Sequence, residues 1–551
     1  MNLYSNKIWA VIIILSMIIP FTTVENNKNV VKENPLLSTY HINEKIQSEI
    51  NNSDVILQAF YWAVPTTTAN GTWYNTIASR MNEISNLGFT YIWLPPPSKT
   101  YGPGLPDSNG SQVGYEPYDY YDLGQYNQQG SINTRYGNKT DLLNLITLAN
   151  NSGISTMADI VLNHNRGGYP QPDGLDFMNI SSGLFPRNAS DFNCGDGPAF
   201  STFPDLCTTN PYVRSEILKW GQWLYDQIGF RGWRFDYTIG YNASTVKAWV
   251  DAIGGLSMVE YWQPDVFSIM NYLQNVPSET KALDFPLMYT FINLFSRNGN
   301  FPMKSLTVPS TSILMTDPNR AVTFVDNHDT VRTAWNNIAL HRDFMYAFIL
   351  LYAGGTPAVF WKDLYPNDPC IDPAGTCPMQ NDLHPQELSV NLRKLLEIRK
   401  DYASGNGSVI YADNDLWIYQ RESNPGLILA MNDNPDVSNN VTISTQYKNV
   451  VLYDLMGKGK ALQVDNQGNA YISVPPLSYL VYVPFTNPPS NVITDILQKP
   501  DTNSITTNTV VSSVNTTTPT SVGFDLSSSL TMTLSSFLVL FLIQERKRRV
   551  K

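Results

Sequence analysis

The sequence predicts an α/β protein: a (β/α)8 TIM barrel with an excursion domain after its third strand and an antiparallel β-sandwich at its C-terminal end. Short runs of β-branched and aromatic residues alternate with helix-length segments across residues 51–405. A stretch rich in Gly, Pro, Asn and Asp at residues 165–210 interrupts this alternation after the third run. Beyond about Tyr402 the helix-length segments stop, and strand-like runs follow one another directly.

Eight buried-looking runs supply the predicted barrel strands, with helix-length segments between most of them, as parallel strands require. In chain order the runs are Val55–Trp62, Thr90–Leu94, Thr156–Leu162, Gly232–Asp236, Ser257–Glu260, Ala282–Phe285, Ala321–Val325 and Pro357–Trp361. The barrel is therefore predicted over residues 51–164 and 211–405, with 165–210 as the excursion domain. Alternating runs then predict the β-sandwich over 406–485, with strands at 409–411, 416–420, 426–431, 450–453, 471–474 and 479–483.

The two ends of the chain differ from the barrel in composition. Residues 1–24 hold a long apolar run, which predicts a secretory signal, with an uncleaved anchor as the alternative. Residues 486–525 are rich in Thr, Ser, Asn and Pro and predict a disordered stalk. Residues 526–543 are apolar apart from Ser and Thr, and a basic tail follows them at once. This predicts a transmembrane anchor, with a buried C-terminal helix as the alternative. We therefore expect an extracellular monomer tethered to the cell surface.

The cysteines and glycosylation sequons agree with an oxidising compartment. The cysteines form two close pairs, Cys194/Cys207 and Cys370/Cys377, whose spacing does not fit a metal site. Two short-loop disulfides are predicted instead. Asn-x-Ser/Thr sequons favour a glycoprotein; they occur at Asn51, Asn70, Asn109, Asn138, Asn150, Asn179, Asn188, Asn242, Asn406, Asn440 and Asn515.

The chain is acidic and rich in aromatic residues. Its formal net charge is −11 at pH 7, and no basic patch is large enough to neutralise phosphates, which argues against a nucleic-acid partner. The 31 Tyr, 23 Phe and 12 Trp favour a carbohydrate partner only weakly, because aromatic rings also fill cores.

Three predicted strands end in acidic residues: Asp236, Glu260 and Asp329. One such acid is most often structural, but three that converge on one barrel mouth indicate a carboxylate-based mechanism. Glycoside hydrolysis uses two carboxylates, one as proton donor and one as nucleophile or base. Arg234 points to the same face of its strand as Asp236 and would keep that carboxyl ionised. Without such help, Glu260 would stay protonated, as a general acid must.

Five motifs in chain order give a more specific result. They are GYEPYD at Gly114–Asp119, DIVLNH at Asp159–His164, GWRFD at Gly232–Asp236, VEYW at Val259–Trp262 and FVDNHDT at Phe324–Thr330. Together they resemble the ordered motif set of glycoside hydrolase family 13, the α-amylases, over about Val55 to Tyr482.

The resemblance implies a retaining hydrolase that cleaves internal α-1,4-glucosidic bonds of starch, glycogen and maltooligosaccharides. Asp236 would be the nucleophile, Glu260 the general acid/base, and Asp329 would hold two hydroxyls of the reacting glucose. The implied substrate-binding residues are Tyr115, His164, Arg234 and His328. For the two histidines the alternative is a core position with its polar atoms satisfied by the protein.

The resemblance also implies a bound calcium ion. Calcium prefers hard oxygen ligands, which carboxylates, amides and backbone carbonyls supply. Its ligands would be Asn163, Asp196 and Asp205, with backbone oxygens near Pro198 and Gly240. The Cys194–Cys207 bridge would staple the same loop. The alternative is that these aspartates only cap turns.

Two departures from the family pattern leave the leaving-group side of the site open. Ile239 stands where many α-amylases carry a lysine, and Val259 replaces a frequent glycine. A 4-α-glucanotransferase or a relative that prefers pullulan or cyclodextrin is therefore an alternative. A non-catalytic glucan-binding or membrane-scaffold protein and a surface-layer structural glycoprotein are further alternatives. Neither explains the three strand-end acids.

Overall fold

The computed structural model describes residues 53–484, except 63, 101–112, 129, 166–176, 202, 331–340 and 370–385. Eight parallel strands form a closed barrel in the neighbour order β1-β10-β9-β8-β7-β6-β5-β2. Every strand overlaps the run predicted for it, so the (β/α)8 prediction is confirmed. The strands are β1 (Ile56–Gln58), β2 (Tyr91–Leu94), β5 (Ser155–Ile160), β6 (Gly232–Phe235), β7 (Leu256–Val259), β8 (Lys281–Leu283), β9 (Ala321–Phe324) and β10 (Thr356–Phe360).

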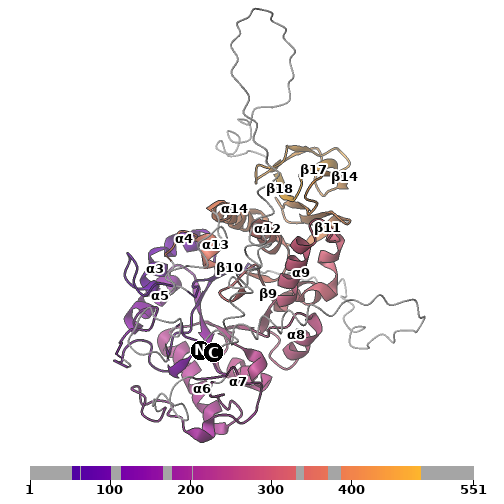
Figure 1. Cartoon of the computed structure of the whole chain (residues 1–551). Coiled ribbons are helices and arrows are strands. Elements are labelled where there is room, and N and C mark those ends of the chain that lie inside the picture. The colour runs from indigo at the N-terminus through magenta and orange to yellow at the C-terminus, as the bar shows by residue number, and fades with distance from the viewer. Residues whose placement is uncertain are drawn as a thin grey trace, which may run out of the picture. The chain divides into compact units, whose positions relative to one another are not determined.

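The helices that follow the strands lie outside the barrel (Figure 1). Several begin at a polar residue whose side chain accepts a backbone N–H of the first turn, for example Asn138 before α5 and Asp284 before α9. The helices are α3 (Trp73–Ser79), α4 (Met81–Asn86), α5 (Lys139–Asn151), α6 (Pro211–Trp223), α7 (Ala243–Ile253), α8 (Val266–Leu273), α9 (Phe285–Ser296), α10 (Ile313–Thr316), α12 (Arg342–Leu351), α13 (Trp361–Leu364) and α14 (Gln386–Tyr402).

The predicted excursion leaves the barrel between β5 and α6. Its described part contains a disulfide between Cys194 and Cys207, which confirms that predicted pair. The other pair, Cys370/Cys377, lies outside the described residues. A short two-stranded sheet, β3 (Lys99–Thr100) with β4 (Pro117–Asp119), contacts the excursion, because both carboxylate oxygens of Asp119 accept hydrogen bonds from Ser182.

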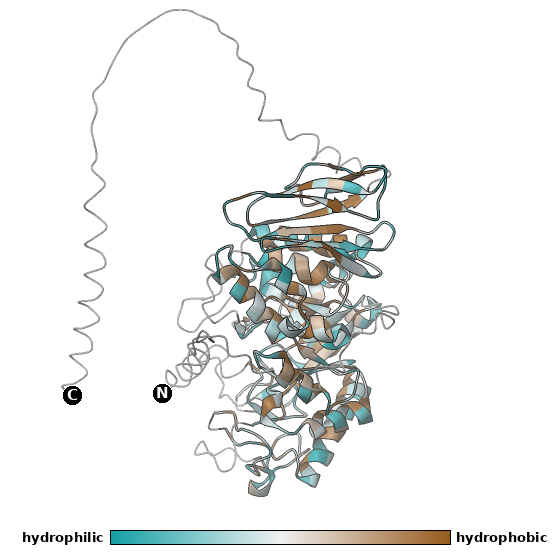
Figure 2. Ribbon diagram, turned by 90° about the vertical axis from the view of Figure 1, so that its right-hand side faces the viewer, coloured by the Kyte–Doolittle hydropathy of each residue, from teal (hydrophilic) through white to brown (hydrophobic). Residues whose placement is uncertain are grey.

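The C-terminal region is a two-layered β-structure, visible edge-on in Figure 2. A six-stranded sheet in the order β11-β12-β13-β18-β15-β16 forms one layer, and the pair β14-β17 forms the other. Apolar side chains such as Ile418, Ile472 and Leu480 form a core between them. The predicted sandwich is therefore confirmed, although β14 and β16 were not predicted. The strands are β11 (Gly407–Ala412), β12 (Leu416–Arg421), β13 (Ile428–Asn432), β14 (Asn439–Ser444), β15 (Val451–Asp454), β16 (Leu462–Gln463), β17 (Asn469–Val474) and β18 (Ser478–Pro484).

The barrel and the six-stranded sheet share one hydrophobic core. Trp417 of β12 packs on Phe348 of α12 with ring centroids 5.2 Å apart. The hydroxyl of Tyr419, on the same strand, accepts the backbone N–H of Ala353 at 3.0 Å. This packing joins the sheet to the barrel through α12.

The predicted location at a cell surface, tethered by a transmembrane segment, is contradicted. Across the described part of the chain, no helix combines the length and the apolar character needed to cross a bilayer. For example, α14 has 17 residues but carries Arg393, Lys394 and Glu397. The segments predicted as signal (1–24), stalk (486–525) and anchor (526–543) themselves lie outside the described residues.

Candidate active site

Acidic side chains from three neighbouring strands meet around one arginine at the barrel mouth. Asp159 lies near the end of β5, Arg234 lies on β6, Asp236 follows β6, and Glu260 follows β7. The Nη1 atom of Arg234 is 2.9 Å from Oδ1 of Asp159 and 2.6 Å from Oδ1 of Asp236. Its Nη2 atom is 2.7 Å from Oε1 of Glu260, an ion-pair contact outside hydrogen-bond geometry. The two predicted catalytic acids, Asp236 and Glu260, therefore contact the same guanidinium group.

The strand register explains this convergence. In the parallel barrel Asp159 pairs with Arg234, and Arg234 pairs with Met258, two residues before Glu260. Side chains alternate between the two faces of a strand, so residues two apart point the same way. The inward side chains of β5, β6 and the end of β7 therefore lie at the same mouth of the barrel.

The electrostatics of the pair differ in part from what the sequence predicted. Arg234 was expected to stabilise the ionised form of Asp236 alone, but it contacts Glu260 as well. Burial nevertheless raises the pKa of the Glu260 carboxyl well above its ordinary value, against the opposing effect of Arg234. The charges of Asp236 and Asp329 raise this pKa further. The environment thus favours the protonated form of Glu260, with burial as the main cause.

Backbone donors fix the position of Glu260. Its Oε2 atom accepts the backbone N–H of Tyr237 at 2.8 Å, and its carbonyl oxygen accepts both the N–H and the hydroxyl of Thr238. Tyr237 has a φ of +46°, a left-handed conformation that is uncommon for a residue other than glycine. Such a conformation persists only where surrounding contacts hold it. The chain segment after Asp236 is therefore shaped around Glu260.

The third acid, Asp329, lies beside an aromatic group. Its Oδ1 atom accepts the indole N–H of Trp62 at 3.2 Å, and its Oδ2 atom lies 3.2 Å from Nε2 of His328. The His328 ring stacks on the ring of Tyr115. Tyr115 in turn donates its hydroxyl to Asp159 at 2.7 Å, which links Asp329 to the arginine cluster. Asp329 is the most accessible of the three predicted acids, with 29% of its side chain exposed against 10% for Asp236 and 7% for Glu260.

Both predicted histidines are buried and have partners in the protein. His164 Nε2 lies 2.9 Å from the carbonyl oxygen of Tyr115, and its ring stacks on Phe200. Burial lowers the pKa of His164, so its ring is neutral at neutral pH. His328 Nδ1 lies 2.7 Å from the side-chain nitrogen of Gln58. The alternative of a satisfied core position therefore describes part of the role of each histidine.

A second cluster lies where the excursion meets the barrel. The Oδ1 atoms of Asn163, Asp196 and Asp205 are all buried without a hydrogen-bond partner. Burial, with a smaller effect of the Asp196 charge, raises the pKa of Asp205 to about 7. The three predicted metal-binding side chains thus leave oxygen atoms unpaired in the protein.

The close packing of two glycines places a backbone carbonyl oxygen near the same cluster. A Cβ atom on Gly240 would lie 2.0 Å from Oδ1 of Asn163, and one on Gly197 would lie 2.1 Å from the carbonyl oxygen of Gly240. Gly197, the residue before Pro198, is therefore in close contact with Gly240. Cys194 and Cys207 also lie near Asp196, but their sulfur atoms form the disulfide and cannot act as ligands.

Sequence reasoning missed several residues of this site, among them Asp159, Trp62 and Gln58. Asp159 was quoted only as the first residue of a motif, although an acid near a strand end was the signal used for the others. Gln58 is the last residue of β1 and Trp62 follows that strand, which has no acidic residue at its end. The strand-end rule could have found both, since it applies to any polar side chain.

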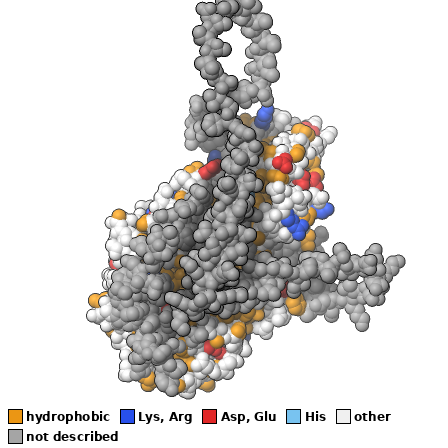
Figure 3. All heavy atoms as spheres, in the orientation of Figure 1, with side chains coloured by type: hydrophobic (Ala, Val, Ile, Leu, Met, Phe, Trp, Pro, Cys, Tyr) orange, Lys and Arg blue, Asp and Glu red, His pale blue; other side chains and the backbone are white. Residues whose placement is uncertain are grey.

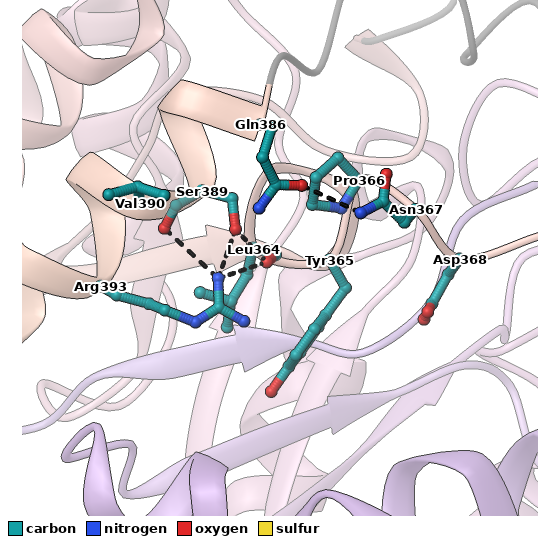
Figure 4. Close-up of a pocket in the computed structure, with 9 residues that line it drawn as sticks. All are labelled: Leu364, Tyr365, Pro366, Asn367, Asp368, Gln386, Ser389, Val390 and Arg393. Atoms are coloured by element: carbon teal, nitrogen blue, oxygen red, sulfur yellow. Dashed lines mark hydrogen bonds between the residues drawn. The ribbon is translucent and has the colours of Figure 1, made fainter.

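A separate pocket of about 170 Å³ lies between α13 and the start of α14, and includes Tyr365, Ser389 and Arg393 (Figure 4). Arg393 donates to the carbonyl oxygen of Leu364 at 2.8 Å, so its guanidinium is engaged by the protein. None of the strand-end acids lines this pocket. The candidate active site is therefore the carboxylate cluster.

Comparisons with known proteins agree with the predicted fold and class of enzyme. A family model described as the α-amylase catalytic domain matches residues 50–168. An α-amylase of Geobacillus stearothermophilus is 27% identical over 520 residues, covering 81% of this chain and 89% of that protein. The cytoplasmic α-amylase of Escherichia coli is 24% identical and covers 75% of this chain and 95% of its own.

Solved structures show the same fold. An α-amylase from Malbranchea cinnamomea matches with a TM-score of 0.62 at 19% identity, covering 80% of this chain and 97% of its own. A cyclomaltodextrin glucanotransferase with three domains matches with a TM-score of 0.59 at 21% identity, covering 78% and 99%.

The fold, the strand-end acids and the matches to known proteins together define a glycoside hydrolase built on a (β/α)8 barrel. Within that class, the chain is similar to the α-amylases, as the motifs predicted.

Proposed function

We propose that the chain hydrolyses internal α-1,4-glucosidic bonds of starch, glycogen and maltooligosaccharides with retention of configuration. The observation that carries this proposal is the contact of one buried guanidinium, Arg234, with both Asp236 and Glu260. A shared guanidinium keeps the two carboxyl groups on one side of the barrel mouth, and retaining enzymes use such a pair, one as nucleophile and the other as proton donor.

In the first step, Asp236 attacks the anomeric carbon while protonated Glu260 gives its proton to the departing glycosidic oxygen. This forms a covalent glucosyl ester on Asp236 and leaves Glu260 ionised. In the second step, Glu260 takes a proton from water, which displaces Asp236 and restores both groups. Because the first step needs the protonated form of Glu260, the rate falls as pH rises through its raised pKa.

The remaining predicted residues, apart from Arg234, would hold the reacting glucose. We assign to Asp329 the 2- and 3-hydroxyls, because its carboxylate is the most exposed of the three. His328 and His164 would bond neighbouring hydroxyls, and Tyr115 would stack beneath the ring. Arg234 is buried against the carboxylates and would act through Asp236 and Glu260, without contact to the sugar.

The surface of the protein suits a neutral polymer. Charged residues make up 15% of the chain, and the described surface visible in Figure 3 is largely uncharged. A polysaccharide offers hydroxyl groups and no charge, so few charged side chains are needed to bind it.

Digestion of amylose with purified enzyme tests the proposed function. We expect a rapid fall in polymer length with a mixture of linear maltooligosaccharides, as internal cleavage gives. Cyclic products, or longer chains formed from maltooligosaccharides without net release of reducing ends, would favour the glucanotransferase alternative. Cleavage of pullulan in preference to amylose would favour the second alternative.

We also propose that the second cluster binds calcium. Asn163, Asp196 and Asp205 would hold the ion with the carbonyl oxygen of Gly240, because each side chain leaves a buried oxygen unpaired. Hard oxygen atoms of carboxylate, amide and carbonyl groups are the ligands calcium prefers. When bound, the ion would neutralise the aspartates and join the excursion, for which we propose the limits 165–210, to the barrel.

Calcium removal is expected to lower the melting temperature. A ligand present at about 1,000 times its Kd stabilises the folded state by about 4 kcal/mol, so chelation should shift the melt by several degrees. The measurement is a thermal melt with and without EGTA. Asp205→Asn should melt lower and lose its response to EGTA, whereas Asp251→Asn, an exposed control, should respond like the unmodified enzyme. A melt that chelation leaves unchanged would remove the calcium site.

A further inference from the structure

We propose that Gln58 is a positioning residue that fixes the tautomer of His328, so that this ring carries its proton on Nε2, the nitrogen beside Asp329. The inference deepens the proposed function, because it concerns how the enzyme holds the carboxylate assigned to the sugar hydroxyls.

Gln58 is built into the barrel wall. It is the last residue of β1, pairs with Trp93 of β2 on one side and Phe360 of β10 on the other, and is 1% exposed. Its side-chain nitrogen lies 2.7 Å from Nδ1 of His328. Both partners are excluded from solvent, so no water competes for this bond.

The chemistry of the amide group then determines the proton position. An amide nitrogen carries two hydrogens and cannot accept a hydrogen bond, so Nδ1 of His328 must offer its lone pair. A neutral imidazole with an unprotonated Nδ1 carries its proton on Nε2. This atom lies 3.2 Å from Oδ2 of Asp329.

The aromatic neighbours hold the plane of the His328 ring. The Tyr115 ring stacks on His328 at 5.3 Å between centroids with an interplanar angle of 13°, and the ring of Phe60 packs at 4.8 Å. With the ring plane fixed in this way, the partner of Nδ1 is what selects the tautomer. Gln58 is that partner, so it determines the tautomer of His328.

Both oxygens of Asp329 thereby lie near nitrogen atoms whose placement depends on β1 and the residues after it. Oδ1 accepts the indole N–H of Trp62 at 3.2 Å, and Oδ2 lies 3.2 Å from the Nε2 atom whose proton Gln58 sets, in a contact outside hydrogen-bond geometry. The reversed tautomer would turn a bare nitrogen lone pair toward the carboxylate. Asp329 would then move away, and a displacement of about 1 Å can cost about 100-fold in rate.

The test combines Gln58→Glu with Gln58→Leu. In Gln58→Glu the carboxylate accepts a hydrogen bond and so favours a proton on Nδ1, and in Gln58→Leu no hydrogen-bonding side chain remains at position 58. We expect kcat/KM on maltooligosaccharides to fall by roughly 10-fold to 100-fold in both. Gln128→Leu removes another buried glutamine, which contacts Asp119 and Asp122, and is the control for loss of stability alone.

Nitrogen-15 NMR of histidine-labelled enzyme reads the tautomer independently of activity. Signals of His328 are assigned by their absence in His328→Asn. The proposal expects a protonated Nε2 and an unprotonated Nδ1 in the unmodified enzyme and in Gln128→Leu, and a protonated Nδ1 in Gln58→Glu. A protonated Nδ1 in the unmodified enzyme would overturn it. So would unchanged His328 signals in Gln58→Glu. Failure of amylose hydrolysis in the unmodified enzyme would instead reject the proposed function.

Discussion

Asp236→Asn is expected to lower kcat on soluble starch by about 10⁴-fold or more while leaving the fold intact, since removal of a nucleophile costs enzymes about this much. The amide cannot form the glucosyl ester, although its oxygen can still accept from Nη1 of Arg234, 2.6 Å away in the unmodified enzyme. Release of reducing sugar and a thermal melt provide the measurements.

Asp251→Asn is the matched control, because Asp251 lies on the surface of α7 and pairs only with an exposed lysine. It should keep full activity. Turnover of Asp236→Asn comparable to that of the control would reject Asp236 as the nucleophile.

Arg234→Met is expected to have the larger effect on stability. The side chain is 0% exposed and contacts Asp159, Asp236 and Glu260, so its removal leaves three buried acids without a counter-charge. Loss of one partner of a buried ion pair typically costs 3–5 kcal/mol. We expect a fall of about that size in the free energy of unfolding, measured by denaturant titration, together with loss of activity.

Two variants separate charge from geometry at this position. Arg234→Lys keeps a positive charge but loses the planar fork that reaches several carboxylates, so it should recover part of the stability and little of the activity. Arg393→Met removes an arginine whose partner, Glu83, is partly exposed, and should change stability by about 1 kcal/mol or less. Equal destabilisation by Arg234→Met and Arg393→Met would show that the central guanidinium does not hold the acids together.

The barrel could be predicted from the sequence because its physical signals are local. Each strand is a short buried run, and the three acids proposed as catalytic follow β6, β7 and β9, where parallel strands end at one mouth. Asp236, Glu260 and Asp329 therefore emerged from strand position together with family resemblance. The strand β14 was not predicted, because Val441 and Ile443 are its only apolar residues and do not form a recognisable run.

The contacts that set the chemistry could not be predicted in this way. The contact between Arg234 and Glu260 depends on the register between β6 and β7. The spacing of residues along the chain does not determine that register. The contact of Gln58 with His328 joins residues 270 positions apart. The tether at 526–543 rested on a marginal apolar run, and an apolar run by itself does not determine where a chain resides.

The most direct test of the central claim is mass spectrometry of enzyme treated with a slowly hydrolysed, fluorinated α-glycosyl fluoride. If one pocket gathers the three acids around a single glucose unit, one sugar becomes bound per chain, on the peptide that contains Asp236. Its hydrolysis should then depend on Glu260. A sugar bound to a different carboxylate, in enzyme that still cleaves starch, would contradict this account.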